Sequence, residues 1–520
     1  MNSDTLIKTF AIIISSIILI TPTVRGQQNS DYKTEIELQA IGTSSKAVPF
    51  WMRSNQFGSI PLKGISGSGI IRTSKDYSVD SGINKLGNSR KIMDWGYGLE
   101  LRFNGGSKSN FQLLETYIKG RVSIFQVKAG RSKDVMGLNG DSSLTSGNFA
   151  VSGNALGIPK VELSIPEYWR VPYLKGIFSI KGTFSHGWVG RTQILDSIRS
   201  LPPSTDVFYI GDNNPATYLH QKSLYVRLGM KDWRLNLIGG VNHQAYWGNE
   251  RRAYGPNFKL SSVETFFYVA TGKAYGSKGV PSSKIGNQLG SIDLGLEYRF
   301  NDVKVMLYRQ NFYDVGALSK LANISDGLNG VTIENLNYSS KNSKLQVKKI
   351  LFELFYSKNQ AGYPWSIPTK SGDEDYYNNF YYLRGWSYKN VGLGNPLITA
   401  IHDARSGQAY TTTDYFLNNR VVGLNGGLSG SLSNITFTGK ATYSWNYGTF
   451  GTSEYGSSTG IIRNPQTNNL FIPVQQLSLY LVAEKYLSKS YSVGCATAFD
   501  TGHLLENSFG ILFNIKKSFR

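Results

Sequence analysis

Alternation of apolar and polar side chains runs along several segments of this chain and constrains its fold more than any other feature. In residues 291–300, apolar or aromatic side chains alternate with small or charged residues such as Asp293 and Arg299. Because successive side chains of a β-strand point to opposite faces, one face of this segment must meet an apolar medium and the other must meet water. The same pattern recurs in residues 95–103 and 509–515. Strands of about ten residues with aromatic ends are typical of the wall of a transmembrane β-barrel.

The composition agrees with a barrel and excludes a helical membrane protein. Only 40% of the residues are apolar, yet 13% are aromatic, with 32 tyrosines and 26 phenylalanines. A polar lumen and aromatic girdles at both membrane interfaces account for this combination. After Ile20 the chain has no long apolar run, so lipid must be met by a closed barrel, in which every backbone group is paired. We therefore predict an all-β fold: a transmembrane antiparallel β-barrel of about 16–18 strands with long extracellular loops.

The N-terminus has the pattern of an export signal. Lys8 precedes an apolar run over residues 10–20, and small residues follow up to Gly26. The run is shorter than the ~20 apolar residues that a transmembrane helix needs. We expect a signal peptide in residues 1–26, an N-terminal periplasmic or plug-like lead-in in residues 27–94, and the barrel in residues 95–520. This organisation predicts a protein of the cell outer membrane.

The chain is strongly basic, with a formal net charge of +20. Nucleic acid is the first partner to consider for such a charge, but an exported protein rarely meets it. An anionic polysaccharide or the phosphate-rich outer leaflet fits the compartment better. We therefore expect an acidic surface polysaccharide and outer-membrane lipid as partners of a monomer, and no nucleic acid.

Two polar segments combine cations with aromatic rings and are predicted to be extracellular loops. Residues 249–288 contain six lysines and arginines against two glutamates, and residues 357–372 add further rings. Aromatic rings can stack on sugar faces while cations pair with uronates. A solvated loop that binds nothing can have the same composition. The residues predicted to bind polysaccharide are Arg251, Arg252, Lys259, Lys273, Tyr254, Tyr363 and Trp365.

Three of the five histidines stand at strand ends, but they do not form a recognisable chemical site. His186, His220 and His243 lack the spacing of metal ligands such as His-Glu-x-x-His, so we predict no metal and no cofactor. Ser185 and His186 are adjacent on a strand and therefore point to opposite faces, which argues against a catalytic pair. We therefore predict no catalytic residues.

Several short motifs occur along the chain in an order that resembles the capsule-assembly Wzi family. They are Ser185-His186-Gly187-Trp188, residues 219–225 with His220 and Lys222, residues 239–248 with His243 and Trp247, Asp375 to Asn379, residues 394–397, residues 414–419 beginning at Asp414, and residues 154–159. The resemblance spans about residue 49 to the C-terminus. The motif residues have no assigned role: His186, Trp188, His220, Lys222, His243, Trp247, Asp375, Asn379 and Asp414.

The resemblance implies an outer-membrane barrel of about 18 strands that acts as a surface lectin. Such a protein binds exported capsular polysaccharide and promotes its attachment or assembly at the cell surface. Family members also carry a helical periplasmic element at the N-terminus, whereas the residues before Trp95 show little helical periodicity here. We predict this non-enzymatic function. The alternatives are a diffusion porin or sugar channel, an outer-membrane hydrolase or acyltransferase, and a tyrosine-rich soluble exported β-protein.

Overall fold

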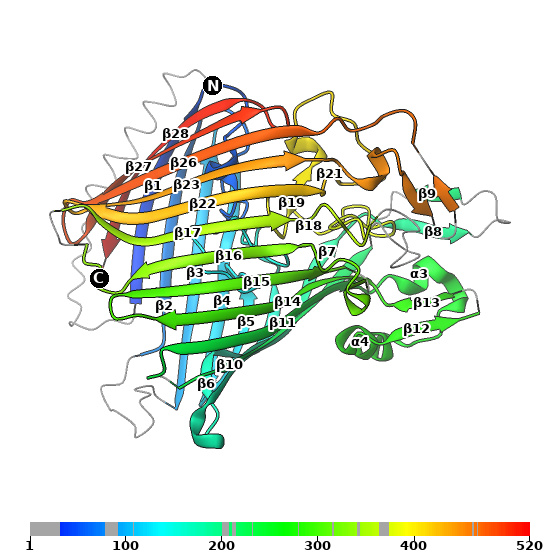
Figure 1. Cartoon of the computed structure of the whole chain (residues 1–520), viewed down its shortest axis with the longest axis horizontal. Helices are drawn as coiled ribbons and strands as arrows, with labels where there is room; N and C mark the ends of the chain where they lie inside the picture. Colours follow the sequence, from blue (N-terminus) through cyan, green and yellow to red (C-terminus); the bar gives the residue numbers. More distant parts are fainter. Residues whose placement is uncertain are drawn as a thin grey trace.

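Eighteen antiparallel strands close into one barrel in the computed structural model of the chain (Figure 1). Each wall strand pairs with the wall strands before and after it, and pairing of the last strand with the first closes the ring. This is the all-β barrel that the alternation predicts. The structure describes residues 32–78, 92–107, 109–199, 207–210, 215–230, 232–278, 280–314, 317–340, 344–362, 374–459, 462–464 and 466–519.

Most wall strands have eleven to fourteen residues, enough to cross a bilayer at a tilt. They are β1 (Tyr32–Thr43), β2 (Ser66–Lys75), β3 (Met93–Gly105), β4 (Asn110–Val122), β5 (Phe125–Arg131), β6 (Lys160–Arg170), β7 (Phe178–Arg191), β10 (Ala216–Leu228), β11 (Leu235–Trp247), β14 (Asn287–Arg299), β15 (Val303–Tyr313), β16 (Gly327–Asn335), β17 (Gln346–Tyr356), β22 (Val421–Leu432), β23 (Ile435–Asn446), β26 (Val474–Tyr486), β27 (Tyr491–Gly502) and β28 (Ser508–Phe519).

Strand β14 contains the alternation from which the barrel was predicted. Ile292 and Leu294 point outward and are exposed, whereas Ser291 and Asp293 point into the lumen and are fully buried. The apolar row continues the lipid-facing surface of the barrel, and the polar row is satisfied inside. The predicted assignment of the two faces is therefore confirmed.

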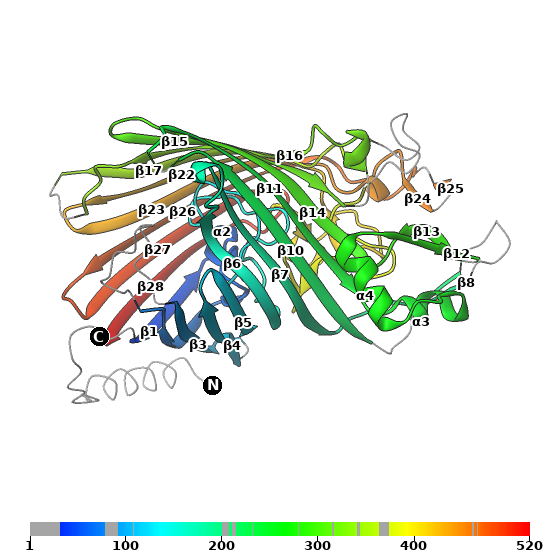
Figure 2. The same ribbon diagram turned by 90° about the horizontal axis from the view of Figure 1, so that it is seen from below.

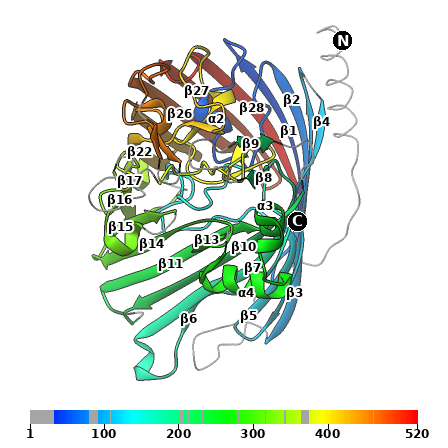
Figure 3. The ribbon, with the colours of Figure 1, turned by 90° about the vertical axis from the view of Figure 1, so that its right-hand side faces the viewer.

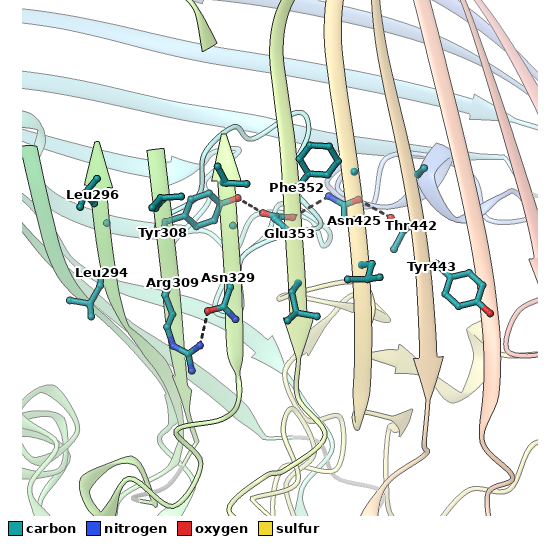
Figure 4. A pocket seen from close by; sticks show the side chains of 18 of the residues that line it. Leu294, Leu296, Tyr308, Arg309, Asn329, Phe352, Glu353, Asn425, Thr442 and Tyr443 are labelled. Carbon is teal, nitrogen blue, oxygen red and sulfur yellow. Dashed lines mark hydrogen bonds between the residues drawn. The ribbon is translucent and has the colours of Figure 1, made fainter. Parts of the chain in front are cut away.

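Hydrogen bonds cross the lumen face of the wall from strand to strand (Figure 4). Glu353 of β17 accepts from Tyr308 Oη at 2.6 Å and from Asn425 Nδ2 at 3.1 Å. Asn425 Oδ1 in turn accepts from Thr442 Oγ1 at 2.8 Å. An apolar hollow of about 1040 Å³ lies along the same strands and is lined by outward side chains such as Leu294. Acyl chains of a bilayer are the natural filling for a hollow on this face.

The two ends of the barrel differ in the length of their connections. Thr34 of β1 pairs with Phe519 of β28, so the first strand begins and the last strand ends at the same end. Connections at that end include the Asn301-Asp302 turn and the Ser433-Asn434 turn. Ser433 and Asn434 have φ values of 46° and 63°, which suit a two-residue hairpin. The opposite end carries residues 44–65, 132–159, 192–215, 248–286 and 357–420. Because bacterial barrels have short periplasmic turns and long outer loops, the second end is extracellular.

The barrel begins earlier than the sequence predicted. β1 pairs with β2 and β28, and β2 pairs with β3, so residues 32–43 and 66–75 are wall strands. This corrects the expected boundary at residue 95. β2 was not recognised because it reads Ser-Gly-Ser-Gly-Ile-Ile-Arg-Thr-Ser-Lys, in which small residues hide the alternation. The signal peptide expected in residues 1–26 lies outside the described residues.

Extracellular segments fold back into the barrel and occupy part of its lumen. We call residues 44–65, 132–159 and 374–420 the plug; Figure 3, which faces the right-hand side of Figure 1, shows coil and short elements inside the ring of strands. Trp51 Nε1 donates to Thr442 Oγ1 at 2.9 Å, and Ser146 N donates to Glu353 Oε2 at 2.6 Å. Phe149 stacks on Phe312 of β15 with ring centroids 4.0 Å apart. The main hydrophobic core of the described residues therefore lies within the barrel.

The remaining elements are short and lie mostly at the extracellular end. The helices are α2 (Phe50–Arg53), α3 (Glu250–Tyr254) and α4 (Ser262–Thr271). The paired short strands are β8 (Leu195–Arg199) with β9 (Val207–Ile210), β12 (Ala274–Ser277) with β13 (Val280–Lys284), β18 (Ser387–Tyr388) with β19 (Val391–Gly392), β20 (Thr399–Ala400) with β21 (Phe416–Asn418) and β24 (Ser457–Thr459) with β25 (Ile462–Asn464). The 3₁₀ turns are η1 (Leu174–Gly176), η2 (Gly255–Asn257), η3 (Ala317–Lys320), η4 (Ile401–Asp403) and η5 (Phe450–Thr452). Among the described residues, no helix is both long enough and apolar enough to cross a membrane.

Candidate functional site

An aromatic pocket of about 80 Å³ opens at the extracellular end, between the 248–286 loop and the plug. Figures 1 and 2 show the loop, with α3, α4, β12 and β13, beyond the ends of the neighbouring wall strands. The pocket is too small to enclose a sugar ring. The pocket is lined by Glu250, Ala253, Tyr254, Phe258, Tyr275, Ser283, Lys284, Ile285, Gly286, Asn379, Phe380, Tyr381 and Tyr382.

The loop side of the pocket is organised by a buried carboxylate at the end of β11. Gly248, at a φ of 110°, turns the chain, and its N–H donates to Glu250 Oε2 at 3.0 Å. Burial raises the pKa of Glu250 to about 7, because desolvation outweighs the backbone hydrogen bonds. Phe258 packs edge-on against Tyr275, with ring centroids 5.1 Å apart. Tyr275 Oη accepts from Lys259 N at 3.0 Å, which fixes the ring at the rim.

The plug side presents one exposed ring and one amide donor. Asn379 Oδ1 accepts from Tyr381 N at 3.0 Å and from Tyr382 N at 2.9 Å, which turns the chain so that Phe380 is 62% exposed. In the described part of the chain, no protein acceptor is found for Asn379 Nδ2, which leaves it available to a hydroxyl. Tyr381 Oη donates to Asn249 O at 2.8 Å and ties the plug to the loop.

Some of the predicted polysaccharide-binding residues lie in or near this pocket. Tyr254 lines it, and Arg251, Lys259 and Lys273 are exposed on the same loop. Among the described residues, none of these three cations has a carboxylate within 4.0 Å. Arg252 is half-buried on α3. Tyr363 and Trp365 lie outside the described residues.

Sequence reasoning missed the plug residues that complete the pocket. Phe380 and Tyr382 come from a segment more than 120 residues beyond Tyr254, and composition does not reveal which loops meet. The aromatic run from Tyr376 to Tyr382 was the available signal. Glu250 was counted only as a charge opposing the cations, although it is buried.

Six residues of the motifs that resemble the Wzi family form one cluster on the outer face of the wall. They lie in the outward rows of β7, β10 and β11, the rows that also contain the exposed Leu224 and Val241. Phe266 of α4 covers them, with ring centroids 5.8 Å from His186, 5.7 Å from His220 and 5.7 Å from Trp247. We call this set the outer cluster: His186, Trp188, His220, Lys222, His243 and Trp247.

In the described residues, the outer cluster has the geometry neither of a three-ligand metal site nor of a Ser185–His186 pair. No group of three His, Cys, Asp or Glu side chains in the described ranges is placed to hold a metal ion. Ser185 is buried on the lumen face, where its Oγ donates to Gln221 O at 3.4 Å, whereas His186 is on the outer face. The two cannot act as a nucleophile and its base.

The other three motif residues belong to the plug. Asp375 Oδ1 accepts from Asn419 Nδ2 at 2.6 Å and from Asn378 Nδ2 at 3.2 Å. Burial raises the pKa of Asp375 and, more strongly, that of Asp414, whose charge is further opposed by Asp375. Asp375 therefore braces the plug, Asp414 lies half-buried in it, and Asn379 alone of the three reaches the pocket.

An 18-stranded wall, long outer loops and a filled lumen define a class: outer-membrane β-barrels closed by their own loops. The chain belongs to the family of the capsule assembly protein Wzi, whose model matches residues 52–426. This confirms the resemblance carried by the motifs, and fold and family together place the chain in the outer membrane.

Solved structures agree with the barrel. The chain is similar to Wzi of Escherichia coli, described as an outer-membrane protein involved in group 1 capsule assembly and a carbohydrate-binding β-barrel, with 10% identity over 92% of this chain and 83% of that chain and a TM-score of 0.52. It is also similar to Pseudomonas aeruginosa OccK2 (OpdF) in complex with glucuronate, with 7% identity over 94% and 98% and a TM-score of 0.42. At these identities the likeness to Wzi establishes the fold. No curated protein matches the chain.

Proposed function

We propose that this protein binds exported acidic capsular polysaccharide at its extracellular surface and promotes its attachment to the cell, acting as a monomer and without catalysis. The observation that carries the proposal is the aromatic pocket between the 248–286 loop and the plug. Tyr254, Tyr275 and Phe380 offer ring faces, and Asn379 Nδ2 offers a donor. Arg251 and Lys259 stand exposed on the same loop.

The geometry favours many weak contacts with a polymer over one tight contact with a small sugar. Exposed ion pairs contribute only about 0–1 kcal/mol each, and the pocket is too small to enclose a ring. A polysaccharide repeats its residues, so each bound unit raises the effective concentration of the next. Affinity then comes from the number of repeats engaged across neighbouring copies of the protein.

The comparisons support the same reading. The family is described as capsule assembly, and the similar Escherichia coli structure is described as carbohydrate binding. The plug favours binding over diffusion, since its residues Trp51, Ser146 and Phe149 are held inside the barrel by contacts with the lumen face of the wall. The separation of Ser185 from His186 across the wall argues against a hydrolase.

The experiment that tests the proposal measures cell-bound capsule in a deletion strain complemented with variants. Phe380→Ala combined with Tyr254→Ala removes two stacking rings, and Arg251, Lys259 and Lys273→Glu reverses three charges. Both sets should release capsule to the medium while the barrel still folds. Their matched controls are Tyr410→Ala, an exposed ring of the plug that does not line the pocket, and Lys348, Lys485 and Lys489→Glu at the periplasmic end.

The controls decide the outcome. Full capsule retention in both test sets, at normal levels of folded barrel, contradicts the proposal. Equal loss in the test and control charge sets would show that net charge, and not the pocket, holds the polymer.

A further inference from the structure

Helix α4 lies on the outside of the barrel and turns an apolar side away from it. Ser261 and Glu264 form a capping box that begins the helix. Phe266 packs on the outer cluster, whereas Val263 and Phe267 are 65% and 60% exposed. Two large apolar side chains one turn apart on the free side of a short helix are unfavourable in water and indicate an apolar neighbour.

The wall around α4 is apolar too. Phe184, Trp188, Leu224 and Val241 on β7, β10 and β11 are all exposed on the outer face. The Phe184 ring centroid lies 6.4 Å from that of Phe266, so the helix continues this surface. α4 therefore sits at the extracellular edge of the lipid-facing belt, where barrels meet the headgroups of the outer leaflet.

Lysines gather at the C-terminal end of the same helix. Lys222 Nζ donates to Ala270 O in the last turn, and Lys273 follows the helix with its Nζ 5.0 Å from the Tyr268 ring centroid. Lys284 pairs with Ala274 across β12 and β13 and so lies beside Lys273. None of these three lysines has a carboxylate within 4.0 Å in the part of the chain that the structure describes. These three positive charges therefore lie beside the apolar side of α4 without an anionic partner among the described residues.

We propose that α4 and its lysines form a binding site for a phosphorylated glycolipid of the outer leaflet. The acyl chains contact Val263 and Phe267 and the adjoining wall. The phosphates bind Lys222, Lys273 and Lys284 at the level of the headgroups. This is the arrangement of an interfacial amphipathic helix, whose apolar side enters the acyl boundary while its cations hold anionic headgroups.

The combination of features selects this occupant. A free phosphate or a soluble acidic sugar would satisfy the lysines but leave Val263 and Phe267 in water. A zwitterionic lipid would cover the apolar side but leave three cations without an anion. A second copy of the chain would bring a further net positive charge to a cationic surface.

The test uses the full-length protein in phosphatidylcholine nanodiscs with fluorescent lipid A as the probe, titrated against its didephosphorylated form. Lys222, Lys273 and Lys284→Gln together should weaken lipid A binding at least about tenfold. The same variant should bind the didephosphorylated form as the wild type does. The Arg replacement of all three lysines should keep binding. Val263→Ser with Phe267→Ser should weaken both lipids.

Matched changes and a competitor complete the design. Lys348, Lys485 and Lys489→Gln at the other end should leave lipid A binding unchanged, and heat-modifiable migration confirms that each variant is folded. Undiminished binding in the folded Gln variant overturns the proposal. Complete displacement of lipid A by millimolar inorganic phosphate, with no effect of the serine changes, overturns the lipid and assigns a small-anion site. No polysaccharide enters this assay, so failure here leaves the proposed function untouched.

Discussion

Glu250→Gln tests the electrostatics of the pocket. The Glu250 side chain is buried in the wall of the pocket that Tyr254 and Phe258 also line, and the described residues place no cation within 4.0 Å of it. Its pKa rises from 4.5 to about 7, which at about 1.4 kcal/mol per pKa unit corresponds to roughly 3 kcal/mol. That value is the largest contribution expected, since an opening loop can relax.

The sign follows from the direction of the shift. Because the pKa of Glu250 is higher in the folded loop than in the opened loop, the folded loop holds the proton more tightly. This contribution to the stability of the loop is fully present below pH 4.5 and is lost as the pH rises to about 7. Above that pH the stability of the loop does not change further through Glu250. A glutamine cannot ionise, so the variant loop should show no such loss.

The assay is amide hydrogen exchange of the 248–286 loop between pH 5 and 8, corrected for intrinsic exchange and expressed as a free energy of opening. The wild-type loop should lose protection as the pH rises, and the variant should not. Glu264→Gln is the matched control: Glu264 is exposed and its pKa is lowered by Ser261, so its contribution is lost only in acid. Equal protection in wild type and Glu250→Gln across this range would refute the reasoning.

Three further changes test other parts of the molecule. Trp51→Ala removes a buried ring that donates to Thr442 and lies beneath Lys440, and it should cost about 3–5 kcal/mol of plug stability. Loss of the plug should appear as conductance in planar bilayers. A variant without conductance would show that Trp51 does not hold the plug. Tyr381→Phe removes the bond to Asn249 and should lower the free energy of loop opening by about 1–3 kcal/mol in hydrogen exchange, whereas Tyr410→Phe should not. Leu294→Arg places a charge on the lipid face and should cost about 2–4 kcal/mol in a urea titration of the folded barrel, with Lys348→Arg as the neutral comparison.

The wall could be predicted because its signal is local. Residues 291–300 show both faces of a strand without reference to any other part of the chain. β2 was missed because Gly67 and Gly69 and the serines beside them have no side chain large enough to mark a face. Its place is set by pairing with β1 and β3.

The plug and the outer cluster depend on contacts that the sequence does not encode locally. Phe149 meets Phe312 across 163 positions, and no period relates them. The motif histidines were expected at strand ends, but His186, His220 and His243 lie within β7, β10 and β11. Alternation with Leu224 could have placed His220 on the outer face. Ser261 and Glu264 carry the spacing of a capping box, so α4 itself could also have been predicted.

The hydrogen bond from Tyr381 to Asn249 also has a mechanical consequence. A capsule drags on its attachment points when fluid flows over the cell, and a pocket built on one free loop would yield to that pull. Here the load entering at Phe380 passes through the Tyr381–Asn249 bond into both the plug and the end of β11. The plug is packed against Phe312 of β15 and Glu353 of β17, so tension spreads over neighbouring strands of the wall. In the proposed function, the plug would make the molecule a stiff anchor for a polymer under shear.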